Sequence, residues 1–186
     1  MKRLFDLSFS IILFIALIIP MMIIAVATKL TSRGPIIFWS DRIGVNNQIF
    51  RMPKFRSMII ETPSLASHLL KEPDSYLSPI GGFLRSTSLD ELPQLISVLR
   101  GDMSIVGPRP ALFNQDNLIL LRAKNGVDKL LPGITGWAQV NGRDELTISD
   151  KVEFDKEYML RKSFWFDMKI LRMTFIKVIK RIGINH

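Results

Sequence analysis

The chain has 186 residues, of which 47% are hydrophobic, and its formal net charge is +8. This length indicates one domain, or one domain with an appendage. The absence of cysteine excludes disulfide bonds, thiolate nucleophiles and cysteine metal sites, and the two histidines make carboxylates better catalytic candidates. A positive charge of this size attracts nucleic acid, anionic lipid and phosphorylated ligands alike, so it does not choose among them.

The N-terminal part contains an apolar run over residues 7–27, in which two serines are the only polar residues. As a helix this run would extend about 31 Å, close to the roughly 30 Å core of a bilayer. Pro20 lies in its middle, where it removes a backbone hydrogen bond and favours a bend. Cations flank both ends, and the positive-inside rule then places both ends on the cytoplasmic side. We therefore predict a re-entrant membrane helix over residues 1–30, bent at Pro20.

Two other interpretations of this run stay open. A straight transmembrane helix with a proline kink has the same composition. A signal peptide is the second alternative, because Ala25-Val26-Ala27 resembles a cleavage site of small residues. Asp6 and the length of the apolar run count against it, and cleavage would leave a secreted basic protein that begins at Thr28.

A β-hairpin is predicted next, because residues 36–40 and 48–51 read as short strands around turn-forming residues. Lys54 and Arg56 then alternate with Phe55, which is typical of a solvated strand face but also fits an edge that faces phosphate. The following stretch to Gly82 contains three prolines without a sustained period. It indicates a loop-rich connection with one short helix at residues 64–71.

The central stretch RSTSLDELPQLISVLRGDMSIVGPRP sets two carboxylates, Asp90 and Glu91, side by side. Ser88 and Glu91 have the spacing of a capping box, and Pro93 is tolerated only near the start of a helix. One helix is therefore predicted to begin between Ser88 and Asp90. Taken alone, the acidic pair is best explained by helix capping. The stretch ends in a proline-locked turn that holds out Arg109, and this combination favours a site for an anionic substrate.

Beyond this stretch, residues 112–130 have a helical pattern, and the segment LLPGITGWAQVNGRDEL contains three glycines. The glycines permit either tight turns or close approach of the backbone to a ligand. The C-terminal part predicts an amphipathic helix with one apolar and one cationic face, formed by Phe164, Met168, Leu171, Phe175, Val178 and Ile182, and by Lys169, Lys177, Lys180 and Arg181. A core-facing helix shows such a stripe too, but we favour a helix at the lipid headgroups.

These elements predict a mostly helical α+β fold. It combines the re-entrant helix of residues 1–30 with one catalytic domain over residues 31–186, on the cytosolic face, that contains a small β-hairpin and amphipathic interfacial helices. No phosphate-binding loop or dinucleotide fingerprint is present. The basic residues do not gather with stacking aromatics, so nucleic acid is not expected as a partner.

Four segments, PKFRSM, RSTSLDELPQL, LRGDMSIVGPRP and LPGITGWAQVNGR, occur in this order and resemble the small form of the bacterial monotopic phosphoglycosyl transferases. The likeness covers nearly the whole chain. It implies transfer of a sugar 1-phosphate from a UDP-sugar to undecaprenyl phosphate, with release of UMP and a need for Mg²⁺. It also implies a place at the cytoplasmic face of the bacterial inner membrane, where surface glycan synthesis begins.

The resemblance further implies roles for single residues. Asp90 would be the nucleophile that takes up the phosphosugar and a ligand of Mg²⁺, and Glu91 would assist it. The residues expected to bind substrate or phosphate are Lys54, Arg56, Arg85, Arg109, Arg143 and Asp167. Pro20 matches the proline that bends the re-entrant helix, although this chain has Ile19 where many relatives have a serine.

Simple chemistry agrees with these roles. A carboxylate nucleophile is already ionised at neutral pH, so it needs no histidine base. Arginine can hold phosphate oxygens with paired hydrogen bonds, and Mg²⁺ can bridge the oxygens of a diphosphate. The non-enzymatic alternative is a membrane-anchored basic adaptor that binds anionic lipid or nucleic acid; it would need no Mg²⁺ and would tolerate the loss of Asp90 and Glu91. The sequence does not choose the sugar or the glycan pathway, and it leaves a homo-oligomer open.

Overall fold

The computed structural model describes residues 1–63, 72–142 and 145–180. The predicted helix at residues 64–71 and the predicted site residue Arg143 lie outside this part of the chain. The described helices, 3₁₀ turns (η) and strands are α1 (Lys2–Thr31), β1 (Ile37–Ile43), η1 (Val45–Asn47), β2 (Ile49–Phe55), η3 (Pro73–Tyr76), α2 (Gly81–Ser86), η4 (Leu89–Glu91), α3 (Gln94–Arg100), β3 (Ser104–Val106), α4 (Asp116–Lys124), η5 (Val127–Lys129), β4 (Gly133–Thr135), α5 (Trp137–Asn141), α6 (Ile148–Arg161) and α7 (Phe164–Lys180). The predicted α+β class, mostly helical, is confirmed.

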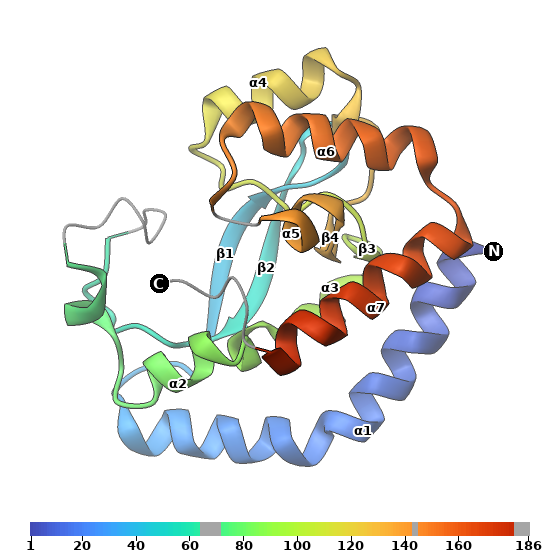
Figure 1. The fold of residues 1–186 in the computed structure, drawn as a ribbon. Coiled ribbons are helices and arrows are strands. Elements are labelled where there is room, and N and C mark those ends of the chain that lie inside the picture. The colour runs from blue at the N-terminus through green and yellow to red at the C-terminus, as the bar shows by residue number, and fades with distance from the viewer. Residues whose placement is uncertain (64–71, 143–144, 181–186) are drawn as a thin grey trace.

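Helix α1 includes the whole apolar run, and Figure 1 shows that it bends in its middle. Pro20 lies inside this helix, and a proline there removes a backbone bond and crowds the preceding turn, which is a common cause of a sharp bend. Among the described helices, α1 is the one long and apolar enough to cross a membrane, and 11% of its most apolar window is buried. This exposure of apolar side chains favours association with lipid.

Both ends of α1 are fastened to the rest of the chain. Near its start, the buried Asp6 accepts hydrogen bonds from Ser104 Oγ at 2.8 Å and from the Ile105 backbone N–H at 3.2 Å. Just beyond its end, Ser32 accepts hydrogen bonds from Arg56 Nη2 through its carbonyl oxygen (3.0 Å) and its Oγ (2.7 Å). The folded body therefore holds α1 at both of its ends.

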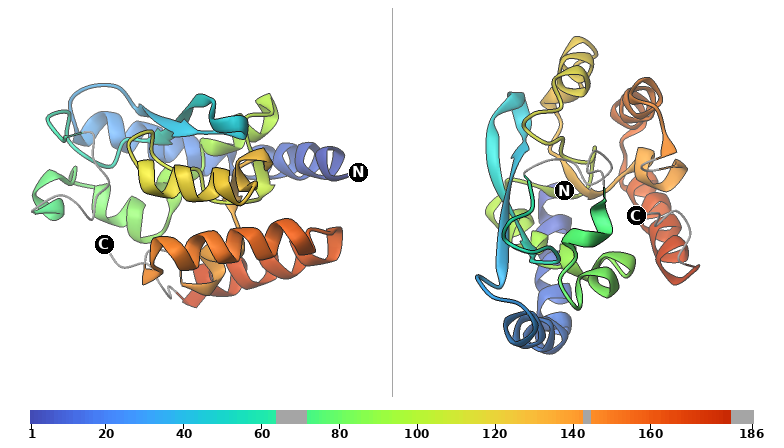
Figure 2. Two further views of the ribbon diagram at one scale, coloured as in Figure 1. Left: turned by 90° about the horizontal axis from the view of Figure 1, so that it is seen from above. Right: turned by 90° about the vertical axis from the view of Figure 1, so that its left-hand side faces the viewer.

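The predicted hairpin is confirmed, with longer strands than the pattern indicated. Strands β1 and β2 pair antiparallel, with Ser40 opposite Met52. Asn46 and Asn47 adopt the left-handed conformation in the turn between them, which asparagine tolerates better than most residues. Figure 2 shows the hairpin on one side of the molecule and α6 and α7 on the opposite side.

The second sheet, β3 and β4, lies between these two sides and its strands run parallel. It belongs to the main hydrophobic core, whose buried members are Met52, Leu95, Val98, Met103, Ile105, Val106, Trp137, Val140, Tyr158, Phe166 and Ile170. The loops that follow the two strands pack backbone against backbone. A Cβ atom on Gly136 would lie 2.0 Å from the carbonyl oxygen of Gly107, so this close approach requires glycine. The glycine-rich segment thus packs against the loop that leads to Arg109.

The prediction of a single helix from Ser88 onward is wrong. The chain forms the short 3₁₀ turn η4, and α3 begins only after Pro93. Ser88 lies in the left-handed region (φ 56°), which is uncommon for residues other than glycine, and its side chain caps nothing. The predicted capping box fails because Glu91 bonds two cations instead of reaching back to Ser88. The interruption places Asp90 and Glu91 on a turn between two helices.

The predicted C-terminal helix is confirmed as α7, but its buried face differs from the predicted apolar stripe. Phe166 and Ile170 point into the core, whereas Phe164 and Phe175 are 54% and 67% exposed. Part of the predicted stripe therefore faces outward, as an interfacial helix requires. The predicted stripe member Ile182 and the cation Arg181 lie outside the described residues.

The hydrogen bonds of Asp6 predict a test of how firmly α1 is held. Asp6→Ala would leave the buried Ile105 N–H without its partner, and the Ser104 hydroxyl would keep only the Val106 carbonyl oxygen, at 3.1 Å, as an acceptor. We expect the free energy of unfolding to fall by about 3 kcal/mol, measured by denaturant unfolding in detergent micelles. Ser8→Ala, on an exposed position of the same helix, is the matched control and should change it by less than about 0.5 kcal/mol. Equal stability of the two variants would contradict the role of Asp6.

Candidate active site

The site is built around Glu91, which lies in the turn η4. Its Oε1 accepts hydrogen bonds from Lys54 Nζ at 2.8 Å and from Arg109 Nη2 at 2.7 Å, and Arg109 Nη1 lies 3.4 Å from Oε2. Lys54 comes from β2 and Arg109 from the loop after β3. We call these three residues the ion cluster. Three of the segments that carry the sequence resemblance therefore meet at one carboxylate.

The neighbouring carboxylates Asp90 and Glu91 have different electrostatic surroundings. Burial acts to raise the pKa of Glu91, but the charges and hydrogen bonds of Arg109 and Lys54 outweigh it and hold the pKa well below its usual range. For Asp90, burial raises the pKa above its usual value, the charge of Lys54 opposes the rise, and the charge of Glu91 adds to it. Neighbouring acids with diverging pKa values are typical of sites where each acid has its own role.

Asp90 is buried, at 8% exposure, and no side chain in the described part of the chain donates a hydrogen bond to it. Arg85 of α2 lies close enough for its charge to lower the pKa of Asp90. Arg85 itself donates a hydrogen bond to Met58 Sδ at 3.3 Å. The structure thus brings together four of the predicted residues besides Glu91: Lys54, Arg85, Asp90 and Arg109.

Arg42 is a further cation near the site that the sequence analysis missed. Its Nη1 donates to the carbonyl oxygen of Pro110 at 3.2 Å. Burial and the positive charge of Arg109 lower its pKa to about 10, against the opposing charge of Glu91. Arg42 lies in β1 beyond the end of the predicted strand, so no local signal separated it from the other surface cations.

Two of the predicted residues lie at the ends of α1 instead of at Glu91. Arg56 is buried and bonds Ser32, as described above. Asp167 is also buried, and it accepts hydrogen bonds from Lys2 Nζ at 2.7 Å and from the Tyr158 hydroxyl at 2.9 Å. In this structure both residues hold α1 to the domain, and Arg143 lies outside the described residues.

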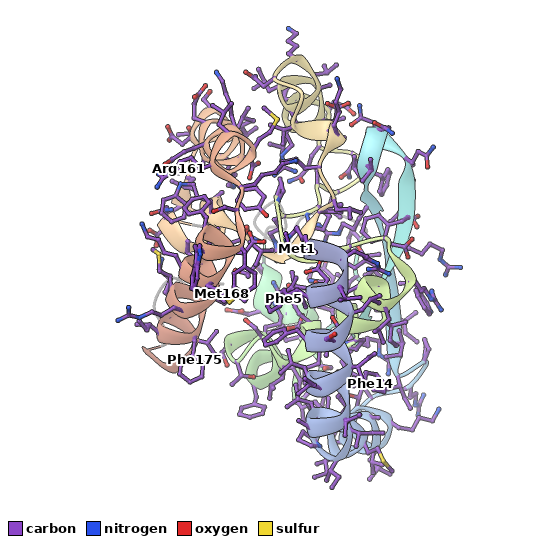
Figure 3. The ribbon with its side chains drawn as sticks, turned by 90° about the vertical axis from the view of Figure 1, so that its right-hand side faces the viewer. Met1, Phe5, Phe14, Arg161, Met168 and Phe175 are labelled. Atoms are coloured by element: carbon purple, nitrogen blue, oxygen red, sulfur yellow. The ribbon has the colours of Figure 1, made fainter. Side chains whose placement is uncertain are left out.

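A pocket of about 270 Å³ lies beside the ion cluster. Ser88, Glu91 and Arg109 line its polar part. Side chains of two helices line much of the rest, and all but Thr174 and Lys177 are apolar: Phe9, Leu13 and Leu17 of α1, and Leu171, Thr174, Lys177 and Val178 of α7. Figure 3 views the side of the molecule that α1 and α7 border, with Phe5 and Phe14 labelled on α1 and Met168 and Phe175 on α7. The pocket therefore joins a charged end to apolar walls.

The side chains that the structure describes do not form a metal site on their own. Within the described ranges, no group of three or more His, Asp or Glu side chains is placed to hold a metal ion. Mg²⁺ commonly binds through one or two carboxylates together with substrate phosphates and water. Asp90 fits that use, because it accepts no hydrogen bond from a described side chain, whereas Glu91 already has two cationic partners.

The sequence matches the family model described as Bacterial sugar transferase over residues 1–181. An undecaprenyl-phosphate glucose phosphotransferase of Komagataeibacter xylinus is 42% identical over 189 residues, which cover 96% of this chain and 36% of that protein. A UDP-glucose:undecaprenyl-phosphate glucose-1-phosphate transferase of Escherichia coli (strain K12) is 45% identical over 162 residues, which cover 83% and 35%.

A third relative, the uncharacterized sugar transferase EpsL of Bacillus subtilis (strain 168), is 40% identical over 187 residues, which cover 100% of this chain and 90% of that protein. The chain thus spans little more than a third of the length of the first two relatives and most of the third. The family match extends over the membrane-type helix, the acidic pair and the ion cluster alike. The chain belongs to the bacterial sugar transferase family.

Proposed function

We propose that this protein moves a sugar 1-phosphate from a UDP-sugar to undecaprenyl phosphate and releases UMP, as the first membrane step of surface glycan synthesis. The observation that carries the proposal is the pocket that joins Glu91 and Arg109 to the apolar walls of α1 and α7. Its charged end suits phosphate groups, and its apolar walls suit an isoprenoid chain. The names of the two relatives that mention undecaprenyl phosphate and glucose support the same substrates.

In this proposal Asp90 is the nucleophile. Its carboxylate oxygen attacks the phosphorus that bears the sugar, the new O–P bond replaces the bond to the second phosphate, and UMP leaves with that electron pair. A phosphate oxygen of the lipid acceptor then attacks the same phosphorus and restores the carboxylate. Burial leaves Asp90 weakly solvated and thus available for attack. The exchange in two steps lets a water-soluble donor and a lipid acceptor use one pocket in turn.

The cations supply the charge stabilisation that phosphoryl transfer requires. Arg109 lines the pocket, so phosphate oxygens there would meet its charge directly. Lys54 and Asp90 do not line the pocket, but Lys54 Nζ lies 2.8 Å from Oε1 of the lining residue Glu91, and Asp90 is the chain neighbour of Glu91. Glu91 stays ionised because its pKa is held low, and it fixes the two cations beside Asp90. We therefore assign Glu91 the task of positioning Lys54 and Arg109, and not that of a proton carrier.

Mg²⁺ is the proposed cofactor, with Asp90 and the donor diphosphate as its ligands. When bound, the ion would neutralise negative charge on the diphosphate and so lessen its repulsion of the attacking carboxylate. The chain's own contribution is the buried carboxylate of Asp90, which has no hydrogen-bonding partner among the side chains that the structure describes. Its oxygens therefore remain available to a metal ion.

We also propose that α1 enters the membrane from the cytoplasmic side and returns to it. The structure supports this geometry because both ends of α1 bond the same domain, so a straight span would have to break one set of bonds. The bend in Figure 1 lets the helix turn within one leaflet. The side chains that would contact lipid share high exposure: Ile11, Ile12, Ile15, Ile18, Ile19, Met22, Ile23 and Val26.

The assignment of Asp90 as the nucleophile is tested by the mass that the protein gains from the donor. Wild-type protein incubated with Mg²⁺ and a UDP-hexose, without acceptor, should gain the mass of one hexose phosphate on Asp90, found by peptide mass spectrometry. Asp90→Asn should show no such gain, and UMP release should fall by at least about 10³-fold, as expected for loss of a nucleophile. Asp116→Asn, on an exposed position at the start of α4, is the control and should behave as wild type. UMP release near the wild-type rate in Asp90→Asn would exclude the assignment.

The raised pKa of Asp90 predicts the pH dependence of the reaction. A nucleophilic carboxylate must be deprotonated, so kcat/KM should fall as the pH drops through its pKa, at a pH above the usual aspartate range. Lys54 opposes this rise. Lys54→Met should therefore move the acidic limb of the kcat/KM profile to higher pH, in addition to lowering the rate. A limb that stays in place, or moves to lower pH, would contradict this role of Lys54.

The path of α1 can be tested with single cysteines, because the chain has none of its own. Leu4→Cys and Leu30→Cys lie at the two ends of the helix, with exposures of 72% and 80%. A membrane-impermeant maleimide should label both from the cytoplasmic side and neither from the other side. Ile19→Cys, beside the proline, should resist labelling from both sides. Labelling of the two ends from opposite sides would establish a straight span instead.

A further inference from the structure

We infer that Arg122 and Asp155, a buried ion pair outside the pocket, are positioning residues that hold Arg109 in place for the reaction. Arg122 lies on α4 and Asp155 on α6, and neither lines the pocket. Arg122 Nη1 donates a hydrogen bond to the carbonyl oxygen of Arg109 at 2.7 Å. The role assigned to Arg109 rests on the proposed function, but the geometric part of the inference does not.

The loop that carries Arg109 is fixed through its carbonyl groups. Arg109 stands between Pro108 and Pro110, which have no N–H group to donate. The four successive carbonyl oxygens from residue 108 to residue 111 each accept one hydrogen bond, from Gly133 N (2.8 Å), Arg122 Nη1 (2.7 Å), Arg42 Nη1 (3.2 Å) and Ile43 N (2.9 Å). The bond from Arg122 is the one made to Arg109 itself.

Asp155 fixes the orientation of the Arg122 guanidinium. Its Oδ2 accepts hydrogen bonds from Arg122 Nε at 2.9 Å and from Nη2 at 2.6 Å. Both side chains are buried, with Asp155 at 1% exposure and Arg122 at 9%. With Nε and Nη2 bound to the carboxylate, Nη1 is directed at the Arg109 carbonyl. The chain of contacts runs from Asp155 through Arg122 to Arg109, whose guanidinium bonds Glu91.

The alternative is that the pair only joins α4 to α6. A buried ion pair can often be replaced by apolar residues of similar size without loss of stability. Removal of one partner is destabilising, because it leaves the other charge buried without a counter-charge. A purely structural pair would therefore be replaceable as a unit. A positioning pair would not be, because methionine at position 122 cannot donate a hydrogen bond to the Arg109 carbonyl.

The experiment compares Arg122→Met with the double variant Arg122→Met/Asp155→Leu. We expect the single variant to lose both thermal stability and activity. The double variant should recover the wild-type Tm within a few degrees but keep a kcat for UMP release about 10- to 100-fold below wild type, since a shift of about 1 Å in a catalytic group has effects of this size. Recovery of kcat together with Tm would overturn the inference.

A double-mutant cycle tests whether the effect passes through Arg109. In an Arg109→Met background, Arg122→Met/Asp155→Leu should change kcat less than about twofold, because the group that it positions is already absent. If Arg122→Met/Asp155→Leu lowers kcat by the same factor in the Arg109→Met protein as in the wild type, the pair acts elsewhere and the inference is overturned.

A second readout needs no turnover, so it separates this inference from the proposed function. Side-chain ¹⁵N spectra in micelles should show slowly rotating guanidinium Nη signals for Arg109, assigned by their absence in Arg109→Lys protein. These signals should be lost in the double variant. Unchanged Arg109 signals would overturn the inference, even if no UDP-sugar proved to be a substrate. Wild-type protein that turns over no donor but shows the expected spectra would refute the proposed function alone.

Discussion

The site depends on one carboxylate shared by two cations. Glu91 lies within 2.8 Å of both Lys54 and Arg109. Glu91 comes from the turn before α3, Lys54 from the hairpin and Arg109 from the loop after β3. Without this negative charge, Lys54 and Arg109 would repel each other in a partly buried place, with Arg42 close by. The ion cluster thus fixes parts of the chain that local sequence alone would leave unconnected. It also creates the positive field that a phosphate group would meet.

The same arrangement explains why two adjacent acids can differ. Asp90 is buried and Glu91 is mostly buried, with 12% of its side chain exposed, and burial alone raises the pKa of each. Glu91 has two bonded cations and stays ionised. Asp90 interacts with these cations only through their charge, and no side chain in the described ranges donates a hydrogen bond to it. Side chains of neighbouring residues on a 3₁₀ turn point about 120° apart, so the cations that bond Glu91 do not bond Asp90. In the proposed reaction this leaves one acid to position the cations and the other to attack.

The sequence was informative wherever a feature is local. It predicted the membrane-type helix, its proline bend, the hairpin and α7, because each depends on composition or period over a short window. The capping box failed because the cations that bind Glu91 come from distant segments, and their charge-assisted bonds replace a local cap. Arg42, Arg122 and Asp155 were missed for the same reason, since only the folded chain shows that they bond the Arg109 loop or one another.

The anchoring of α1 and the geometry of the site are parts of one connected structure. Asp6 bonds the first two residues of β3, and that strand leads directly into the loop that presents Arg109. The pocket draws one wall from α1 itself, so a displacement of the helix would change both the pocket and the strand behind the ion cluster. In the proposed reaction, the depth of α1 in lipid would therefore set the height of Asp90 above the membrane. An acceptor whose phosphate lies at the headgroup level can be reached only if that height is fixed, and the buried hydrogen bonds of Asp6 help to fix it, together with the bonds of Arg56 to Ser32 and of Lys2 to Asp167.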